Sequence, residues 1–268
     1  MGSDKNANKE SQKKSQKKSL PTSEQIIAVI PSRYGSTRLP GKPLLKILGK
    51  ELLAWVIEGV KQSKLLDSII VATDDARIAD LAQSLGVEAV MTSADLASGT
   101  DRIWAAARDR QFSLAVNIQG DEPMVNGSLI DSLVAPMMEH PEWEMGTIAH
   151  PMDVADLPNP NAVKVICNQR NEAIYFSRFG IPYSRQIAPS VNLACLKHIG
   201  MYCYRRSFLQ KFCAQPPGLL EQGEALEQLR ALEMGAKIFV QRVEQKPWGV
   251  DTPEDLKKIE EFLGRKNG

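Results

Sequence analysis

Strand-length apolar runs alternate with helix-length amphipathic segments along most of this 268-residue chain. The expected strands cover residues 26–30, 68–72, 87–91, 114–118, 145–150, 162–167, 199–204 and 237–241. The expected helices cover residues 52–63, 76–85, 100–110, 127–138, 223–233 and 253–262. Parallel strands need long crossover connections, which helices supply, so this rhythm predicts an α/β fold with a doubly wound, mostly parallel sheet. Ligands of such sheets bind beyond the carboxyl ends of the strands.

Composition and charge narrow the class of protein. An apolar content of 43% lets the chain bury a substantial core, either in one large domain or in one domain with a smaller lobe. Residues 1–19 carry six lysines against two acidic residues, so they hold +4 of charge and leave about −3 on the rest of a chain whose net charge is +1. We therefore predict a disordered basic tail over residues 1–19, followed by a single domain over residues 20–268.

The same features argue against nucleic-acid binding, a membrane span and secretion. The near-neutral balance gives no sign of a nucleic-acid-binding protein, and no stretch is apolar and long enough to cross a membrane. The tail lacks the apolar region of a secretory signal. Four scattered cysteines without a C-x-x-C pair fit free thiols in a reducing compartment, so we expect a cytoplasmic protein.

A cation-rich loop follows the first expected strand directly. The segment Pro31-Ser-Arg-Tyr-Gly-Ser-Thr-Arg-Leu-Pro-Gly-Lys-Pro43 contains Arg33, Arg38 and Lys42 together with two glycines. Glycine lets backbone N–H groups approach an anion, and arginine and lysine supply the charge that a polyphosphate requires. Neither of the two standard phosphate-binding motifs is present, so the loop alone is equally compatible with a polar turn.

Two carboxylates are candidates for a metal ion. The turn Gly120-Asp121-Glu122-Pro123 directly follows the apolar segment 114–119, which would bring Asp121 to the sheet edge that faces the cation-rich loop. Asp251 precedes Thr252 and Pro253, a pattern that also fits an ordinary helix start. The histidines lack the spacing of metal ligands, so any metal would be held by carboxylates, which favours a hard cation such as Mg²⁺.

Motifs along the chain resemble those of the 3-deoxy-manno-octulosonate (Kdo) cytidylyltransferases. They are Arg33-Tyr-Gly-Ser-Thr-Arg-Leu-Pro-Gly-Lys42, Ser98-Gly-Thr-Asp-Arg102, Asn117-Ile-Gln-Gly-Asp-Glu-Pro123, Asn159-Pro-Asn-Ala-Val-Lys-Val165, Tyr175-Phe-Ser-Arg178, His198-Ile-Gly-Met-Tyr202, Leu226-Glu-Gln-Leu-Arg230 and Gly249-Val-Asp-Thr-Pro-Glu-Asp-Leu256. The resemblance runs from about residue 26 to about residue 256, which is nearly all of the chain after its tail.

The resemblance implies a nucleotide-diphospho-sugar transferase fold with a smaller dimerisation and sugar-binding lobe near residues 159–201, and a homodimer. It also implies transfer of CMP from CTP to the anomeric hydroxyl of Kdo, with release of pyrophosphate, for lipopolysaccharide biosynthesis. The residues it implies for the nucleotide are Arg33, Ser36, Arg38, Lys42, Ser98, Gly99, Thr100 and Gln119. Those for the sugar are Arg178, His198, Tyr202, Glu227 and Gln228, and those for catalysis are Lys42, Asp121 and Asp251, with Mg²⁺ on the two aspartates.

Some positions depart from the family pattern. Leu96 stands where many members have a histidine before Ser-Gly-Thr, and Gln222 stands where a histidine often follows Leu-Glu. The 8-amino-8-deoxy analogue of Kdo is therefore a second candidate substrate. Transfer of a cytidylyl group to a nonulosonic acid or a polyol phosphate, and regulation by nucleotide binding without turnover, are two further candidate functions. By local pattern alone, His198 fits a core histidine and Glu227 fits a surface pair with Arg230.

Overall fold

The computed structural model describes residues 25–35, 39–183, 185, 195–244, 249–250 and 252–266. Its strands are β1 Ile26–Ser32, β2 Lys46–Ile47, β3 Lys50–Glu51, β4 Ser68–Thr73, β5 Glu88–Met91, β6 Leu114–Asn117, β7 Met145–Pro151, β8 Lys164–Cys167, β9 Ala173–Ser177, β10 Cys195–Arg205 and β11 Ile238–Arg242. Its α-helices are α1 Leu52–Val60, α2 Ala76–Ser84, α3 Gly99–Ala107, α4 Gly127–Glu139, α5 Arg206–Ala214, α6 Leu219–Glu224, α7 Gln228–Glu233 and α8 Pro253–Lys266. The tail predicted over residues 1–19 lies outside the described residues.

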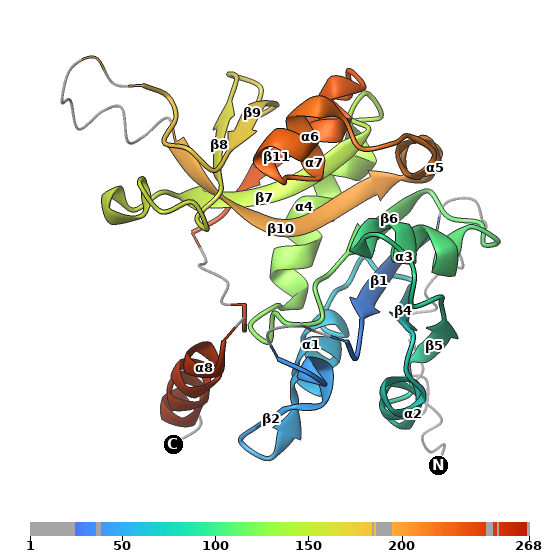
Figure 1. Ribbon diagram of the computed structural model, residues 1–268. Coiled ribbons are helices and arrows are strands. Elements are labelled where there is room, and N and C mark those ends of the chain that lie inside the picture. Colours follow the sequence, from blue (N-terminus) through green and yellow to red (C-terminus); the bar gives the residue numbers. More distant parts are fainter. Residues whose placement is uncertain are drawn as a thin grey trace, which may run out of the picture.

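A mixed sheet forms the centre of the molecule (Figure 1). Its strands follow the order β11-β7-β10-β6-β1-β4-β5, and β8 and β9 extend it from β10. β1 pairs in parallel with both β4 and β6, and β4 pairs in parallel with β5. β10 runs antiparallel to both of its neighbours, β6 and β7. The predicted α/β class with a mostly parallel, doubly wound sheet is confirmed.

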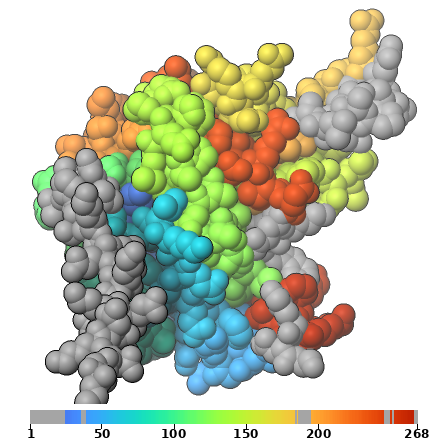
Figure 2. Space-filling model, turned by 180° about the vertical axis from the view of Figure 1, so that it is seen from behind, coloured from blue at the N-terminus to red at the C-terminus, as the bar shows by residue number. Residues whose placement is uncertain are grey.

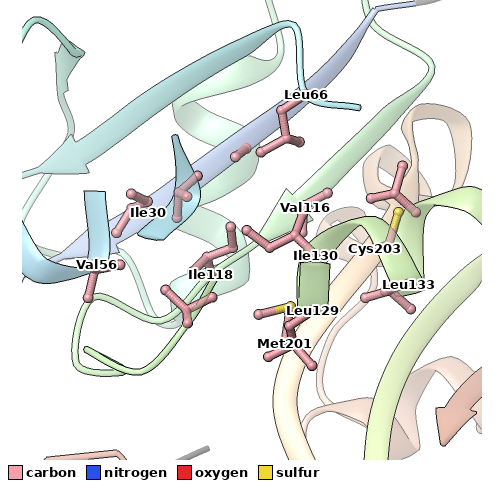
Figure 3. Close-up of a cluster of buried hydrophobic side chains, with 14 of the residues drawn as sticks. Ile30, Val56, Leu66, Val116, Ile118, Leu129, Ile130, Leu133, Met201 and Cys203 are labelled. Atoms are coloured by element: carbon pink, nitrogen blue, oxygen red, sulfur yellow. The ribbon is translucent and has the colours of Figure 1, made fainter. Parts of the chain in front are cut away.

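Helices cover both faces of the sheet because the central strands are apolar on both sides. In β1, Ile26, Ala28 and Ile30 belong to one buried cluster, which also includes residues of α1, α2 and α4. Figure 3 shows part of this cluster, including Ile30 and Val116 of the sheet, Val56 of α1, and Leu129 and Leu133 of α4. The alternate residues of β1 face a second cluster, to which α3, α5 and α7 contribute. Figure 2 shows α1 and α4 on the face behind the view of Figure 1.

A third, smaller apolar cluster lies under α8. Ile259 and Leu263 of this helix are buried together with Val250, Ile47 and Leu52. Leu39 of the cation-rich loop and Met124, which follows the Asp121 segment, pack against the same cluster. The cluster under the last helix therefore also contacts both segments in which the sequence predicts ligand-binding residues.

The structure corrects the expected helix over residues 223–233. Two helices, α6 and α7, replace it, because Ala225 adopts a left-handed conformation with φ of 51° that ends α6. β9 and α5 are not among the elements expected from the sequence. Both are short, and they are stabilised by pairing with β8 and by packing in the second cluster, which are tertiary contacts.

Gly59 of α1 lies against the backbone of the segment after Asp121. A Cβ atom at Gly59 would stand 2.0 Å from the carbonyl oxygen of Val125. We expect Gly59→Ala to lower the free energy of unfolding by about 3 kcal/mol, because backbone on both sides cannot yield easily. Urea unfolding measures this change, and Gly264→Ala in α8, where no atom lies within 4 Å, is the matched control. Equal stability of both variants would contradict the close contact.

Candidate active site

The cation-rich loop begins where β1 ends, at the carboxyl edge of the parallel strands. Arg33 is exposed there, and the chain returns at Gly41, whose N–H donates to the carbonyl of Tyr34 at 2.9 Å. Lys42 then opens a short 3-10 helix, Lys42–Leu44. The predicted nucleotide-binding residues Ser36 and Arg38 lie outside the described residues.

Lys42 and Asp121 meet at this edge, as the sequence analysis expects. Lys42 Nζ lies 2.5 Å from Asp121 Oδ2, and the two side chains are 11% and 32% exposed. Asp121 stands four residues beyond the end of β6, which neighbours β1. The two parallel strands therefore deliver one cation and one carboxylate to the same point.

The segment before α8 returns to the same place. The N–H of Val250 donates to the carbonyl of Asp121 at 2.9 Å. Asp251 is the next residue in the chain, and it lies outside the described residues. The two-aspartate metal site thus stays a prediction. Among the described residues no three His, Cys, Asp or Glu side chains form a metal-binding group.

The donor chemistry at Asp121 nevertheless fits a hard cation. Its carboxylate is accessible, and within the described part of the chain its second oxygen accepts no hydrogen bond. Oxygen ligands of this kind suit Mg²⁺.

Glu122 is a residue of this site to which the sequence analysis gave no role. Its side chain is buried, and in the part of the chain that the structure describes Oε2 has no hydrogen-bond partner. Burial, helped by the negative charge of Asp121, raises the pKa of Glu122 to about 8, although Lys42 acts in the opposite direction. The two adjacent carboxylates of the Gly-Asp-Glu-Pro turn could have drawn attention to Glu122. Which of the two is buried, however, depends on tertiary packing.

The loop from Ser98 to Thr100 starts helix α3 and contacts the predicted sugar side. Ser98 Oγ caps the helix by accepting the N–H of Asp101 at 3.1 Å. Thr100 Oγ1 donates to Glu227 Oε2 at 2.7 Å. Gly99 lies between them as the first residue of α3. The predicted base loop and a predicted sugar ligand are therefore in direct contact.

Two of the predicted sugar ligands have unused polar atoms inside the protein. Glu227 Oε1 and Gln228 Nε2 are buried, and neither has a hydrogen-bond partner among the described residues. The nearest cation to Glu227 Oε1 is Arg230 Nη2, at 3.8 Å. The hydroxyl of Tyr202 donates to Gln228 Oε1 at 3.2 Å, and Gln119 Nε2 donates to Asn117 Oδ1 at 3.2 Å. Buried polar groups rarely stay unpaired in a protein, so these atoms indicate the position of a polar ligand.

Contacts around α6 and α7 explain how Glu227 reaches this position. Arg230 forms a bidentate ion pair with Glu221, at 2.6 and 2.7 Å, whereas its nearest distance to Glu227 is 3.8 Å. The expected pair of Glu227 with Arg230 is therefore present, but Arg230 is buried and binds Glu221 more closely, so it is not a simple surface pair. Arg178 donates to the carbonyls of Glu224 and Ala225, at 2.7 and 3.1 Å, and so holds the bend before Glu227. A contact of Arg178 with the sugar stays a prediction.

Known proteins place the chain in a family. The sequence model of the family described as cytidylyltransferase matches residues 27–238. A 3-deoxy-manno-octulosonate cytidylyltransferase of Bdellovibrio bacteriovorus is 52% identical over 89% of this chain and 98% of the relative. The 3-deoxy-manno-octulosonate cytidylyltransferase of Syntrophotalea carbinolica is 44% identical, also over 89% of this chain and 98% of the relative. The chain belongs to the 3-deoxy-manno-octulosonate cytidylyltransferase family. The family resemblance predicted from the motifs is confirmed.

Solved structures agree with this membership. A CMP:2-keto-3-deoxy-manno-octonic acid synthetase in complex with CTP superposes with a TM-score of 0.86 at 39% identity, over 91% of this chain and all of that chain. A 4-diphosphocytidyl-2C-methyl-D-erythritol synthase of Anaerococcus prevotii gives a TM-score of 0.62 at 12% identity, over 91% of this chain and all of that chain, and shows the fold alone. No helix among the described residues is long and apolar enough to span a membrane.

His198 is a neutral side chain in this family member. Nε2 lies 3.0 Å from Thr147 Oγ1, which also lies 2.8 Å from the carbonyl of Met201. A carbonyl only accepts, so the threonine proton goes to a carbonyl and Nε2 donates to the hydroxyl. The ring also packs edge-on against Phe176. Burial lowers the pKa of His198 to about 3. The residue is only partly buried and belongs to none of the buried clusters, so it is not the core histidine that the local pattern favours. A sugar contact of His198 stays a prediction.

This depressed pKa predicts a loss of stability in acid. Unfolding returns the histidine to a pKa of about 6.5, so its contribution to stability is present above pH 6.5 and is lost as the pH falls towards 3. At pH 5 the loss amounts to at most about 2 kcal/mol. Urea unfolding at pH 7.5 and pH 5 should show a smaller pH effect for His198→Gln than for the parent. An identical pH effect in both proteins would contradict the assignment.

Proposed function

We propose that this protein transfers CMP from CTP to the anomeric hydroxyl of Kdo and releases pyrophosphate. The observation that carries the proposal is the contact of Lys42 with Asp121 at the carboxyl edge of the parallel strands. The unpaired atoms of Glu227 and Gln228 support a second, polar substrate. The names of the family members and the CTP complex of the structural relative support the choice of CTP and Kdo.

The nucleotide residues have complementary roles in this proposal. Arg33, Arg38 and Lys42 supply positive charge to the triphosphate, and Ser36 supplies a hydroxyl donor. Ser98, Gly99, Thr100 and Gln119 lie on the side of the base. Lys42 stabilises the negative charge that accumulates on the leaving pyrophosphate. Attack by the sugar hydroxyl in line with that leaving group requires no covalent intermediate on the protein.

Asp121 and Asp251 are the proposed ligands of Mg²⁺. When bound there, the ion would lower the pKa of the sugar hydroxyl and neutralise phosphate charge. Asp121 also orients Lys42 through their ion pair. The carboxylate therefore serves both the cation of the protein and the proposed metal.

The acceptor residues are proposed to recognise a 2-keto sugar acid. Glu227 Oε1 accepts from a sugar hydroxyl, and Gln228 Nε2 donates to a sugar oxygen, which would satisfy both unpaired atoms. Tyr202 fixes the Gln228 amide through its hydroxyl, and His198 and Arg178 complete the proposed acceptor side.

A pyrophosphate-release assay tests the function. We expect release with CTP, Kdo and Mg²⁺, and none when EDTA replaces the metal. Parallel reactions with UTP, and with the 8-amino analogue of Kdo, establish the base and the sugar. Binding of CTP without release under any of these conditions would contradict the proposal and favour a regulatory nucleotide-binding protein.

We also propose a cytoplasmic homodimer that serves lipopolysaccharide biosynthesis. Phe179 and Tyr183 are 78% and 87% exposed, and they support an interface within residues 159–201. All four cysteines are free, which fits a reducing compartment. Sedimentation of the parent and of a Phe179→Ser/Tyr183→Ser variant tests the interface, because the variant should sediment as a monomer.

A further inference from the structure

Tyr34 in the cation-rich loop is held on several sides. Its N–H donates to Asp74 Oδ1 at 3.3 Å, and its carbonyl accepts the N–H of Gly41 at 2.9 Å. The guanidinium of Arg77 lies 3.7 Å from the centroid of its ring. Gly41 has a φ of 67°, and a Cβ atom there would stand 2.9 Å from the ring. Because Lys42 follows Gly41 directly, Tyr34 restrains the backbone from which the Lys42 side chain extends.

Asp74 links this loop to a buried cation. Its second oxygen, Oδ2, lies 3.4 Å from Nη2 of Arg102, whose side chain is only 1% exposed. Nη1 of Arg102 donates to the hydroxyl of Thr92, which in turn donates to the carbonyl of Thr73 at 3.1 Å. A buried guanidinium that lost its partner would carry a large desolvation penalty. One oxygen of the Asp74 carboxylate is therefore fixed by Arg102, while the other accepts the N–H of Tyr34.

Helix α3 extends the link to the acceptor side. Arg102 lies in the first turns of α3, two residues after Thr100, which donates to Glu227. Contacts thus run without a break from Glu227 through α3 to Asp74, and from there through Tyr34 to Gly41 and Lys42.

We propose that Asp74 is a positioning residue for the nucleotide, because its carboxylate joins the Tyr34 amide to the Arg102 guanidinium and so fixes Lys42 relative to helix α3. The inference rests on the proposed function, in which Lys42 binds the triphosphate. Asp74 acts through Tyr34 and is not itself proposed to contact the reacting atoms.

A matched pair of variants tests this role. Asp67 Oδ2 accepts the N–H of Ile26 at 2.9 Å, so it joins β4 to β1 at the opposite end of the two strands from Asp74. Asp74→Ala should raise the KM for CTP and the Kd for CTP by about tenfold, and change the KM for Kdo by less than about threefold. Asp67→Ala should leave all three constants within about twofold of the parent.

Two double variants separate positioning from general stability. Asp74→Ala leaves Arg102 without its carboxylate, so Asp74→Ala/Arg102→Met should regain melting temperature without regaining affinity for CTP. In a Lys42→Ala background, Asp74→Ala should lower the affinity for CTP by less than a further factor of about two. Asp74 acts on the nucleotide through Lys42, so its effect disappears once Lys42 is removed.

The outcomes distinguish this inference from the proposed function. Restored CTP affinity in Asp74→Ala/Arg102→Met, or an undiminished tenfold effect in the Lys42→Ala background, would overturn the positioning role. A parent protein that binds CTP but releases no pyrophosphate with Kdo would refute the proposed function, while calorimetric CTP affinities of the same variants would still decide the role of Asp74.

Discussion

Asp121→Asn is expected to lower kcat for pyrophosphate release by roughly 10³-fold. The substitution keeps the shape of the side chain but removes the negative charge that pairs with Lys42 and that is proposed to bind Mg²⁺. The pair is partly exposed, so the melting temperature should change by only a few degrees. Initial rates at saturating CTP and Kdo, over a range of Mg²⁺ concentrations, measure the effect.

Asp109→Asn is the control for this experiment. The Asp109 side chain is 92% exposed, and its nearest ion pair, with Arg108, is 3.6 Å long. The kcat of Asp109→Asn should equal that of the parent protein. If Asp121→Asn kept more than about a tenth of the parent rate, Asp121 could not be the ligand on which catalysis depends.

Lys42→Ala should have the second largest effect, a fall in kcat/KM for CTP of roughly 10²- to 10³-fold. The ammonium group is nearly buried and is held by Asp121 at the edge where the proposed triphosphate binds. Without the ammonium group, no positive charge from Lys42 stabilises the departing pyrophosphate, and Asp121 loses its ion-pair partner. Lys42→Arg should recover only part of the rate, because a planar guanidinium cannot occupy the same point. Steady-state kinetics with CTP as the varied substrate give both values.

Lys46→Ala is the matched control, because Lys46 lies four residues further on and is 62% exposed. It should change kcat/KM by less than about twofold. Comparable losses in Lys42→Ala and Lys46→Ala would mean that general positive charge, and not the defined contact with Asp121, attracts the nucleotide.

The apolar periodicity was sufficient to predict the centre of the fold. In β1, Ile26 to Ile30 are buried on both faces, and a run of this kind strongly favours a central strand. The meeting of Lys42 and Asp121 was also predictable, because parallel strands end at one edge. These features depend on local pattern and on one general rule of topology.

Several details of the structure depend on contacts that no local pattern contains. The break at Ala225 requires a left-handed residue that is not glycine, and it is held by Arg178, which follows β9. The burial of Glu122, and the pairing of Arg102 with Asp74 across 28 positions, follow from packing between separate segments. Propensity and spacing could not have predicted them.

The separate packing of α8 gives the enzyme a weak point that its main body does not share. Ile259 and Leu263 bury themselves in a cluster of their own, away from the two large clusters beside the sheet. Small clusters of this kind open at lower cost than a whole domain, so the helix can detach while the sheet stays folded. Because the N–H of Val250 donates to the carbonyl of Asp121, detachment would first disturb the edge at which Lys42 meets Asp121. On gradual warming, turnover should therefore cease before the circular dichroism of the sheet changes, and amides of α8 should exchange hydrogen earlier than those of α1, α3 and α4.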